Sequence, residues 1–137
     1  MGKSLLAAKL KLRAGHRAAL INAPAGYRKD LGTLPPGITV SGALRGSFDW
    51  IQIFAKNRNE LRRLAPRAVR ALGAEGILWV SFPKGTSQVQ TDLTRDAGWK
   101  VLRRYRLKWV TLVAVDRTWS AFAMRPYRPG EARRSFR

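Results

Sequence analysis

Two groups of basic side chains stand at helical spacing in this sequence, and rows of this kind can bind phosphate. Arg63, Arg67 and Arg70 are separated by four and three residues, so on a helix they form one stripe. A second group of similar spacing follows some thirty residues later. The candidate nucleic-acid-binding residues are Arg63, Arg67, Arg70, Lys100, Arg103 and Arg104. Such a row can track phosphates, but many charge runs are only the solvated face of a helix, and no known nucleic-acid-binding motif accompanies these two.

The residue types needed for catalysis or metal binding are scarce. The chain has no cysteine and one histidine, His16, which excludes thiolate metal sites and disulfides. Asp49 and Asp116 stand at strand boundaries without a partner base nearby in the sequence, which favours a structural or capping role. We therefore predict no catalytic residue and no metal site.

Charge is the strongest signal in the composition. The 137 residues include 27 Lys and Arg against 8 Asp and Glu, so the net charge is +19. A field of this sign concentrates polyanions at the surface. Genome-wide bias would explain the excess of Arg over Lys, but it does not explain the shortage of acids. The N-terminus lacks the pattern of a signal peptide, and no apolar run is long enough to span a membrane, so we expect a cytoplasmic protein without a membrane partner.

The hydrophobic pattern predicts one α/β domain over residues 1–125, followed by a loose basic tail over residues 126–137. Nearly continuous apolar runs indicate strands covered on both faces. The predicted strands are 18–23, 38–41, 48–55, 76–82, 109–115 and 119–124. The predicted helices are a stub at 27–31, a helix from about 58 to 72 that Gly73 and Gly76 end, and a helix from 91 or 92 to 105. Three residues between the last two strands require an antiparallel hairpin. The fold class is therefore a mostly parallel, Rossmann-like three-layer sandwich with an antiparallel C-terminal hairpin.

The second half of this pattern resembles class I methyltransferases. Phe48-Asp-Trp-Ile looks like their fourth strand, residues 72–80 look like their helix-to-fifth-strand turn, and the hairpin at 109–124 is similar to their closing strands. Residues 15–27, 79–84 with Thr91-Asp92, and 115–121 resemble a family of short bacterial domains of unknown function. That second resemblance covers most of residues 10–125 and implies no established activity.

The methyltransferase resemblance implies a ligand crevice where the strand order reverses, beyond the strands that end at Ala23 and Ala55. The candidate ligand-binding residues there are Asn22, Pro24, Gly26, Tyr27, Asn57, Pro83 and Lys84. The competing interpretation is that these residues only shape a turn and cap a helix. Methyltransferases place a glycine-rich turn after the first strand and an acid after the second, whereas here residues 22–26 contain a proline and residues 38–45 contain no acid. We therefore expect no cofactor, and no S-adenosylmethionine binding.

Three functional hypotheses remain open at this point. The leading one is a non-enzymatic module that binds a polyanion such as nucleic acid without base specificity. The alternative is a small-ligand binder or enzyme that uses a degenerate methyltransferase-like crevice. The third is an interaction module, or homo-oligomer, that pairs a partner through the weak sheet edge at residues 38–41.

Overall fold

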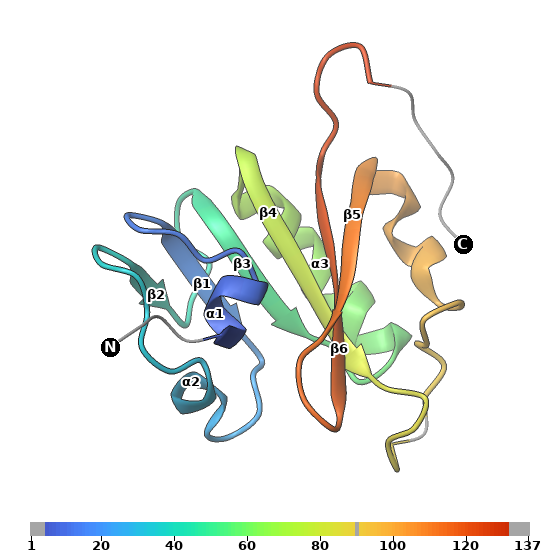
Figure 1. The fold of residues 1–137 in the computed structure, drawn as a ribbon. Coiled ribbons are helices and arrows are strands. Elements are labelled where there is room, and N and C mark those ends of the chain that lie inside the picture. The colour runs from blue at the N-terminus through green and yellow to red at the C-terminus, as the bar shows by residue number, and fades with distance from the viewer. Residues whose placement is uncertain (1–4, 90, 132–137) are drawn as a thin grey trace.

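The computed structural model describes residues 5–89 and 91–131. Six strands form one sheet, and the short helices and one long helix lie on its two faces (Figure 1). The strands are β1 (Arg17–Ile21), β2 (Thr39–Ser41), β3 (Phe48–Phe54), β4 (Leu72–Pro83), β5 (Leu107–Ala114) and β6 (Trp119–Pro126). The helices are α1 (Leu5–Lys9), α2 (Tyr27–Asp30), α3 (Arg58–Ala71) and the 3₁₀ helix η1 (Trp99–Tyr105).

The strand order in the sheet is β2-β1-β3-β4-β6-β5. The first four strands are parallel, whereas β6 runs antiparallel to both β4 and β5. The order reverses between β1 and β3, because the chain moves outward from β1 to β2 and then returns to the other side of β1. These findings confirm the predicted fold class. They also confirm that residues 38–41 contribute an edge strand.

The core consists of two apolar clusters, one on each face of the sheet. On one face, α3 packs Leu61, Leu64 and Ala68 against β3 and β4, and η1 adds Trp99 and Leu102. On the other face, α1 and α2 cover Trp50 and Trp79, which are both fully buried. Figure 1 shows α1 in front of the sheet and α3 behind it.

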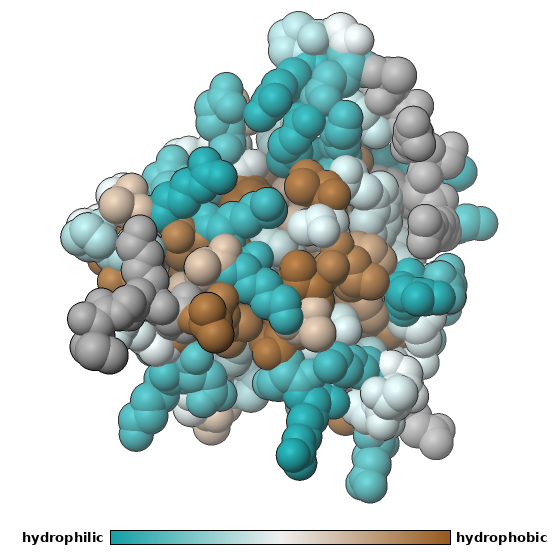
Figure 2. All heavy atoms as spheres, in the orientation of Figure 1, coloured by the Kyte–Doolittle hydropathy of each residue, from teal (hydrophilic) through white to brown (hydrophobic). Residues whose placement is uncertain are grey.

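The layer that holds α1 and α2 is thin, because these helices have only five and four residues. Apolar residues therefore reach the surface between hydrophilic ones on this face (Figure 2). Ile77, Val113 and Val115 are only partly buried there.

Two predictions about helix boundaries were wrong. Residues 91–98 are not helical, and only η1 remains of the helix predicted from 91 or 92 to 105. The reason is that Thr91 and Asp92 bond to Lys56 and Arg58, outside their own segment, which leaves no helical start at this point.

Gly73 and Gly76 do not end α3, because β4 begins at Leu72, directly after the helix. They allow close packing instead: a Cβ atom at Gly76 would lie 2.9 Å from the carbonyl oxygen of Phe48.

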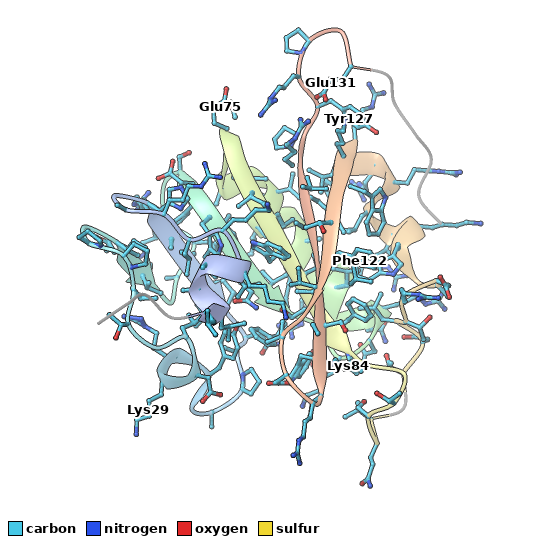
Figure 3. All side chains as sticks on the ribbon, in the orientation of Figure 1. Lys29, Glu75, Lys84, Phe122, Tyr127 and Glu131 are labelled. Carbon is cyan, nitrogen blue, oxygen red and sulfur yellow. The ribbon has the colours of Figure 1, made fainter. Side chains whose placement is uncertain are left out.

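The chain beyond β6 is anchored at Glu131. Its carboxylate accepts hydrogen bonds from Arg125 at 2.8 Å and from Lys108 at 2.8 Å. These bonds hold the pKa of Glu131 well below its usual range, with the Arg125 contact as the largest cause. Figure 3 labels Glu131 and Glu75 at one end of the sheet and Lys84 at the other, carboxyl end of β4. Of the tail predicted to be loose, residues 132–137 lie outside the described residues.

Candidate functional sites

The crevice at the point of strand reversal is present but small. It has a volume of about 200 Å³ and is lined by Asn22, Ala23, Pro24, Lys56, Glu60 and Trp119. Pockets that hold small ligands usually measure roughly 300–1,000 Å³. Of the predicted ligand-binding residues, the structure brings Asn22 and Pro24 into this crevice.

The polar groups of the crevice already bond to one another. Asn22 adopts a left-handed conformation with φ of 61°, which an asparagine tolerates better than most residues. Its amide donates to the carbonyl oxygen of Phe54 at 2.7 Å and to Glu60 at 3.4 Å. The Glu60 carboxylate also accepts from the backbone N–H of Lys56 at 2.8 Å. These bonds tie β1, β3 and α3 together and leave the crevice with a carboxylate at its wall.

A buried chain of hydrogen bonds joins α2, β3 and β4. The hydroxyl of Tyr27 bonds to Oε1 of Gln52 at 3.1 Å, and Nε2 of Gln52 donates to Ser81 at 2.8 Å. Gln52 and Ser81 are fully buried. Burial raises the pKa of Tyr27 far above its ordinary value, so this phenol stays protonated. Tyr27 therefore supports the sheet from inside the core and has no open path to a ligand.

The remaining predicted crevice residues have local structural roles. Gly26 precedes α2 with φ of 83°, a conformation that a side chain rarely adopts. Asn57 caps α3 by accepting from the backbone N–H of Glu60 at 2.9 Å. Pro83 is buried at the end of β4, opposite Trp119. Asp116 likewise stabilises the β5–β6 turn, where it accepts from the backbone of Thr118 and Trp119.

The predicted arginine stripe is on the outer side of α3. Arg63, Arg67 and Arg70 are exposed, and the sheet-facing side of the helix holds the buried leucines and alanines. None of the three forms an ion pair with any residue in the described part of the chain. The charged residues of η1 lie on the same face of the sheet, because α3 and η1 pack beside each other. They are also exposed: Lys100, Arg103 and Arg104.

A notch lies beside the last turn of α3. It has a volume of about 230 Å³ and is lined by Leu44, Gly46, Arg67, Arg70 and Ala71. Only a short loop, residues 42–47, links β2 to β3 here. Beside this loop, Arg17 donates to the carbonyl oxygen of Ser47 at 2.6 Å, and its guanidinium carbon lies 4.2 Å from the centroid of the Phe48 ring.

A third pocket, which sequence reasoning did not find, lies at the carboxyl end of β4. It has a volume of about 380 Å³. Its lining consists of Phe82, Lys84, Gly85, Thr86, Thr94, Arg95, Asp96, Leu112 and Ser120. Lys84 was predicted as a ligand-binding residue, but in the crevice rather than here. The other residues come from three separate segments, so no local spacing in the sequence links them.

Within residues 5–89 and 91–131, no three His, Cys, Asp or Glu side chains gather in a way that would hold a metal ion. In the same residues, no helix is long and apolar enough to cross a membrane.

The crevice does not fit S-adenosylmethionine, the cofactor that the methyltransferase resemblance implies. A cofactor carboxylate needs free donors after β1, but the Asn22 amide is already bonded and Glu60 adds a negative charge. At the end of β2 the hydroxyl of Ser41 is bonded to the backbone of Ala43. The volume of about 200 Å³ is also below that of ordinary ligand pockets.

Comparisons with known proteins identify the fold. No family model matches this sequence, and no curated protein matches it. Solved structures of similar fold include a precorrin-6y C5,15-methyltransferase from Geobacter metallireducens, with a TM-score of 0.59 and 11% identity over 90% of this chain and 86% of that one. A tRNA methyltransferase from B. subtilis has a TM-score of 0.55 and 9% identity over 93% of this chain and 67% of that one.

A protein from Bordetella parapertussis, described as a possible exported protein, has a TM-score of 0.58 and 16% identity over 89% of this chain and 66% of that one. At these identities the likeness shows the fold alone. The chain has a shortened form of the class I methyltransferase fold.

Proposed function

We propose that this domain binds a polyanion, most simply nucleic acid, through the basic face formed by α3 and η1. The observation that carries the proposal is the exposed row of Arg63, Arg67 and Arg70, which has no acidic partner in the described structure. The planar guanidinium of arginine suits phosphate, and each phosphate that is contacted adds to the affinity.

The notch beside α3 strengthens the case for a defined surface. Arg67 and Arg70 line a concave site of about 230 Å³, so a phosphate placed there meets two guanidinium groups at once. The β2–β3 loop forms the other side of this notch, and the contacts of Arg17 hold it in place. Less conformational entropy is therefore lost when a ligand binds. One structural neighbour is named as a tRNA methyltransferase, so this fold is compatible with an RNA partner.

The acids of the chain do little to neutralise this face. Asp49 and Asp116 bond to backbone N–H groups, and Glu131 holds Lys108 and Arg125. Asp92 pairs with Arg58 at 3.1 Å, at the start of α3 and not along its stripe. The positive charge of α3 and η1 therefore stays largely uncompensated where these two helices meet solvent.

The alternative is a small-ligand or enzymatic role for the crevice, and the names of the structural neighbours favour it. The geometry opposes this role, because the polar side chains of Asn22 and Glu60 are already hydrogen-bonded within the protein and are not free to bind a ligand. Pairing with a partner through the edge strand β2 also stays a prediction.

The test measures affinity for duplex and single-stranded DNA and RNA as a function of salt. A variant with Arg63→Glu, Arg67→Glu and Arg70→Glu is expected to lower the slope of log K against log salt by roughly two units or more, because each phosphate contact contributes about 0.7–0.9. The variant should keep the fold, since the changed side chains are exposed.

The matched control reverses three exposed arginines elsewhere: Arg13→Glu, Arg28→Glu and Arg117→Glu. Both variants change the net charge equally, so long-range attraction alone predicts equal losses. Equal losses would remove the case for a defined site on α3. Absence of binding by the unchanged protein at about 0.15 M salt would refute the proposal as a whole.

A further inference from the structure

The pocket beside Lys84, the largest of the three described above, lies apart from the arginine row and has a different chemistry. Its floor is apolar and consists of Phe82 on β4 and Leu112 on β5. Leu112 is 38% exposed, although the strand it belongs to is part of the sheet. An apolar lining with a few polar groups is typical of small-ligand pockets, so the apolar part of a ligand could cover Leu112 and Phe82.

The rim of the pocket is built from two turns. In the first, the carbonyl oxygen of Lys84 accepts from the backbone N–H of Ser87 at 3.0 Å and from its hydroxyl at 2.7 Å. In the second, the backbone N–H of Thr94 donates to Ala97 at 3.0 Å, and the indole of Trp99 donates to the carbonyl oxygen of Thr94 at 2.6 Å. The backbone of both rims is therefore held in place. Figure 3 shows Lys84 at the end of β4, where the first turn begins.

The rim charges leave one net positive charge. Lys84 and Arg95 are cationic, and Asp96 lies 3.5 Å from Arg95, so that pair is neutral and Lys84 remains. The backbone of Lys84 is held in place, since its N–H donates to the carbonyl oxygen of Thr118 at 2.7 Å. Hydroxyl groups complete the rim and can donate to an oxygen: Thr86, Thr94 and Ser120.

We propose that this pocket binds a small amphiphilic anion, with a carboxylate or phosphate against Lys84 and an apolar body over Leu112 and Phe82. The volume of about 380 Å³ is within the range of small-ligand pockets. The pocket works independently of the arginine row, because none of its lining residues belongs to α3.

The test uses benzoate and phenyl phosphate as probes, and it follows backbone amide shifts by NMR. Benzyl alcohol tests the apolar body without charge, and inorganic phosphate tests charge without the apolar body. Saturable shifts at residues 84–87, 94–96, 112 and 120 are expected with benzoate, phenyl phosphate or both. Benzyl alcohol and inorganic phosphate should bind at least about tenfold more weakly. The better of the two anionic probes identifies which headgroup the site prefers.

Two variants and a control separate the pocket from the general basic field. Lys84→Gln and Leu112→Ser should each weaken binding of the better anionic probe by about tenfold or more. The first removes the contact to the headgroup, and the second removes an apolar contact to the body of the probe. Lys29→Gln removes an equal charge from an exposed residue outside the pocket and outside the basic face, and should leave affinity within about twofold. The triple α3 variant should also keep probe binding, so failure of the nucleic-acid proposal would not affect this result.

Three results would overturn the inference. The first is a lack of saturable shifts with either anionic probe. The second is equal weakening by Lys84→Gln and Lys29→Gln. The third is binding of inorganic phosphate as tight as that of phenyl phosphate, which would show that the apolar floor contributes nothing.

Discussion

The two central tryptophans should differ sharply in what their indole nitrogens contribute to stability. Trp50 and Trp79 lie on neighbouring strands, face the same apolar cluster and are both fully buried. Nε1 of Trp50 donates to the carbonyl oxygen of Leu10 at 2.7 Å, which ties the end of the α1 segment to β3. Nε1 of Trp79 has no hydrogen-bond partner among the described residues.

Exchange of each tryptophan for phenylalanine isolates this difference. Both changes remove a similar volume, so the packing cost largely cancels when they are compared. Trp50→Phe also loses a hydrogen bond worth roughly 0.5–1.5 kcal/mol, whereas Trp79→Phe removes an unpaired buried donor that costs about 1–3 kcal/mol. Trp50→Phe should therefore be less stable than Trp79→Phe by about 2–4 kcal/mol, or roughly 7–14 °C in melting temperature.

The measurement is urea unfolding followed by far-ultraviolet circular dichroism, because tryptophan fluorescence itself changes in these variants. Equal slopes with denaturant are needed for a valid comparison of free energies. If Trp79→Phe is as destabilising as Trp50→Phe or more so, the indole N–H of Trp79 has a hydrogen-bond partner in solution. The predicted difference between the two variants would then be wrong.

Four further results should follow from the same structure. Asn57→Ala should lower the free energy of unfolding by about 1 kcal/mol, measured in urea, because it removes the cap of α3. Trp79→Ala should cost about 3–5 kcal/mol in the same assay. Stability should fall as pH drops below about 4.5, because the folded state holds the pKa of Glu131 below that ordinary value; Glu131→Gln should flatten this dependence in acid titrations of melting temperature. Calorimetry should give a dissociation constant for S-adenosylmethionine weaker than roughly 100 μM, which corresponds to about −5.5 kcal/mol, and tighter binding would favour the enzymatic alternative.

The strands and the outer face of α3 were predictable from the sequence, because both depend on local periodicity. Apolar runs such as residues 48–54 are covered on both faces wherever they lie in a parallel sheet. The three-residue link after residue 115 required a hairpin for reasons of chain geometry alone. The spacing of Arg63, Arg67 and Arg70 likewise predicted one exposed stripe, and the helix places all three on the outside.

Contacts between distant segments decided the rest. The hydrogen bonds of Thr91 and Asp92 to the start of α3 join residues more than thirty positions apart, and they replace the start of the predicted second helix. Asn22 is bonded to Phe54 and Glu60 rather than free in its crevice, which no local pattern reveals. The pocket beside Lys84 exists only because β4, the turn before η1 and the β5–β6 hairpin converge. The sequence by itself therefore determined the elements and the surface charge, whereas long-range packing alone decided which polar groups remain free to meet a ligand.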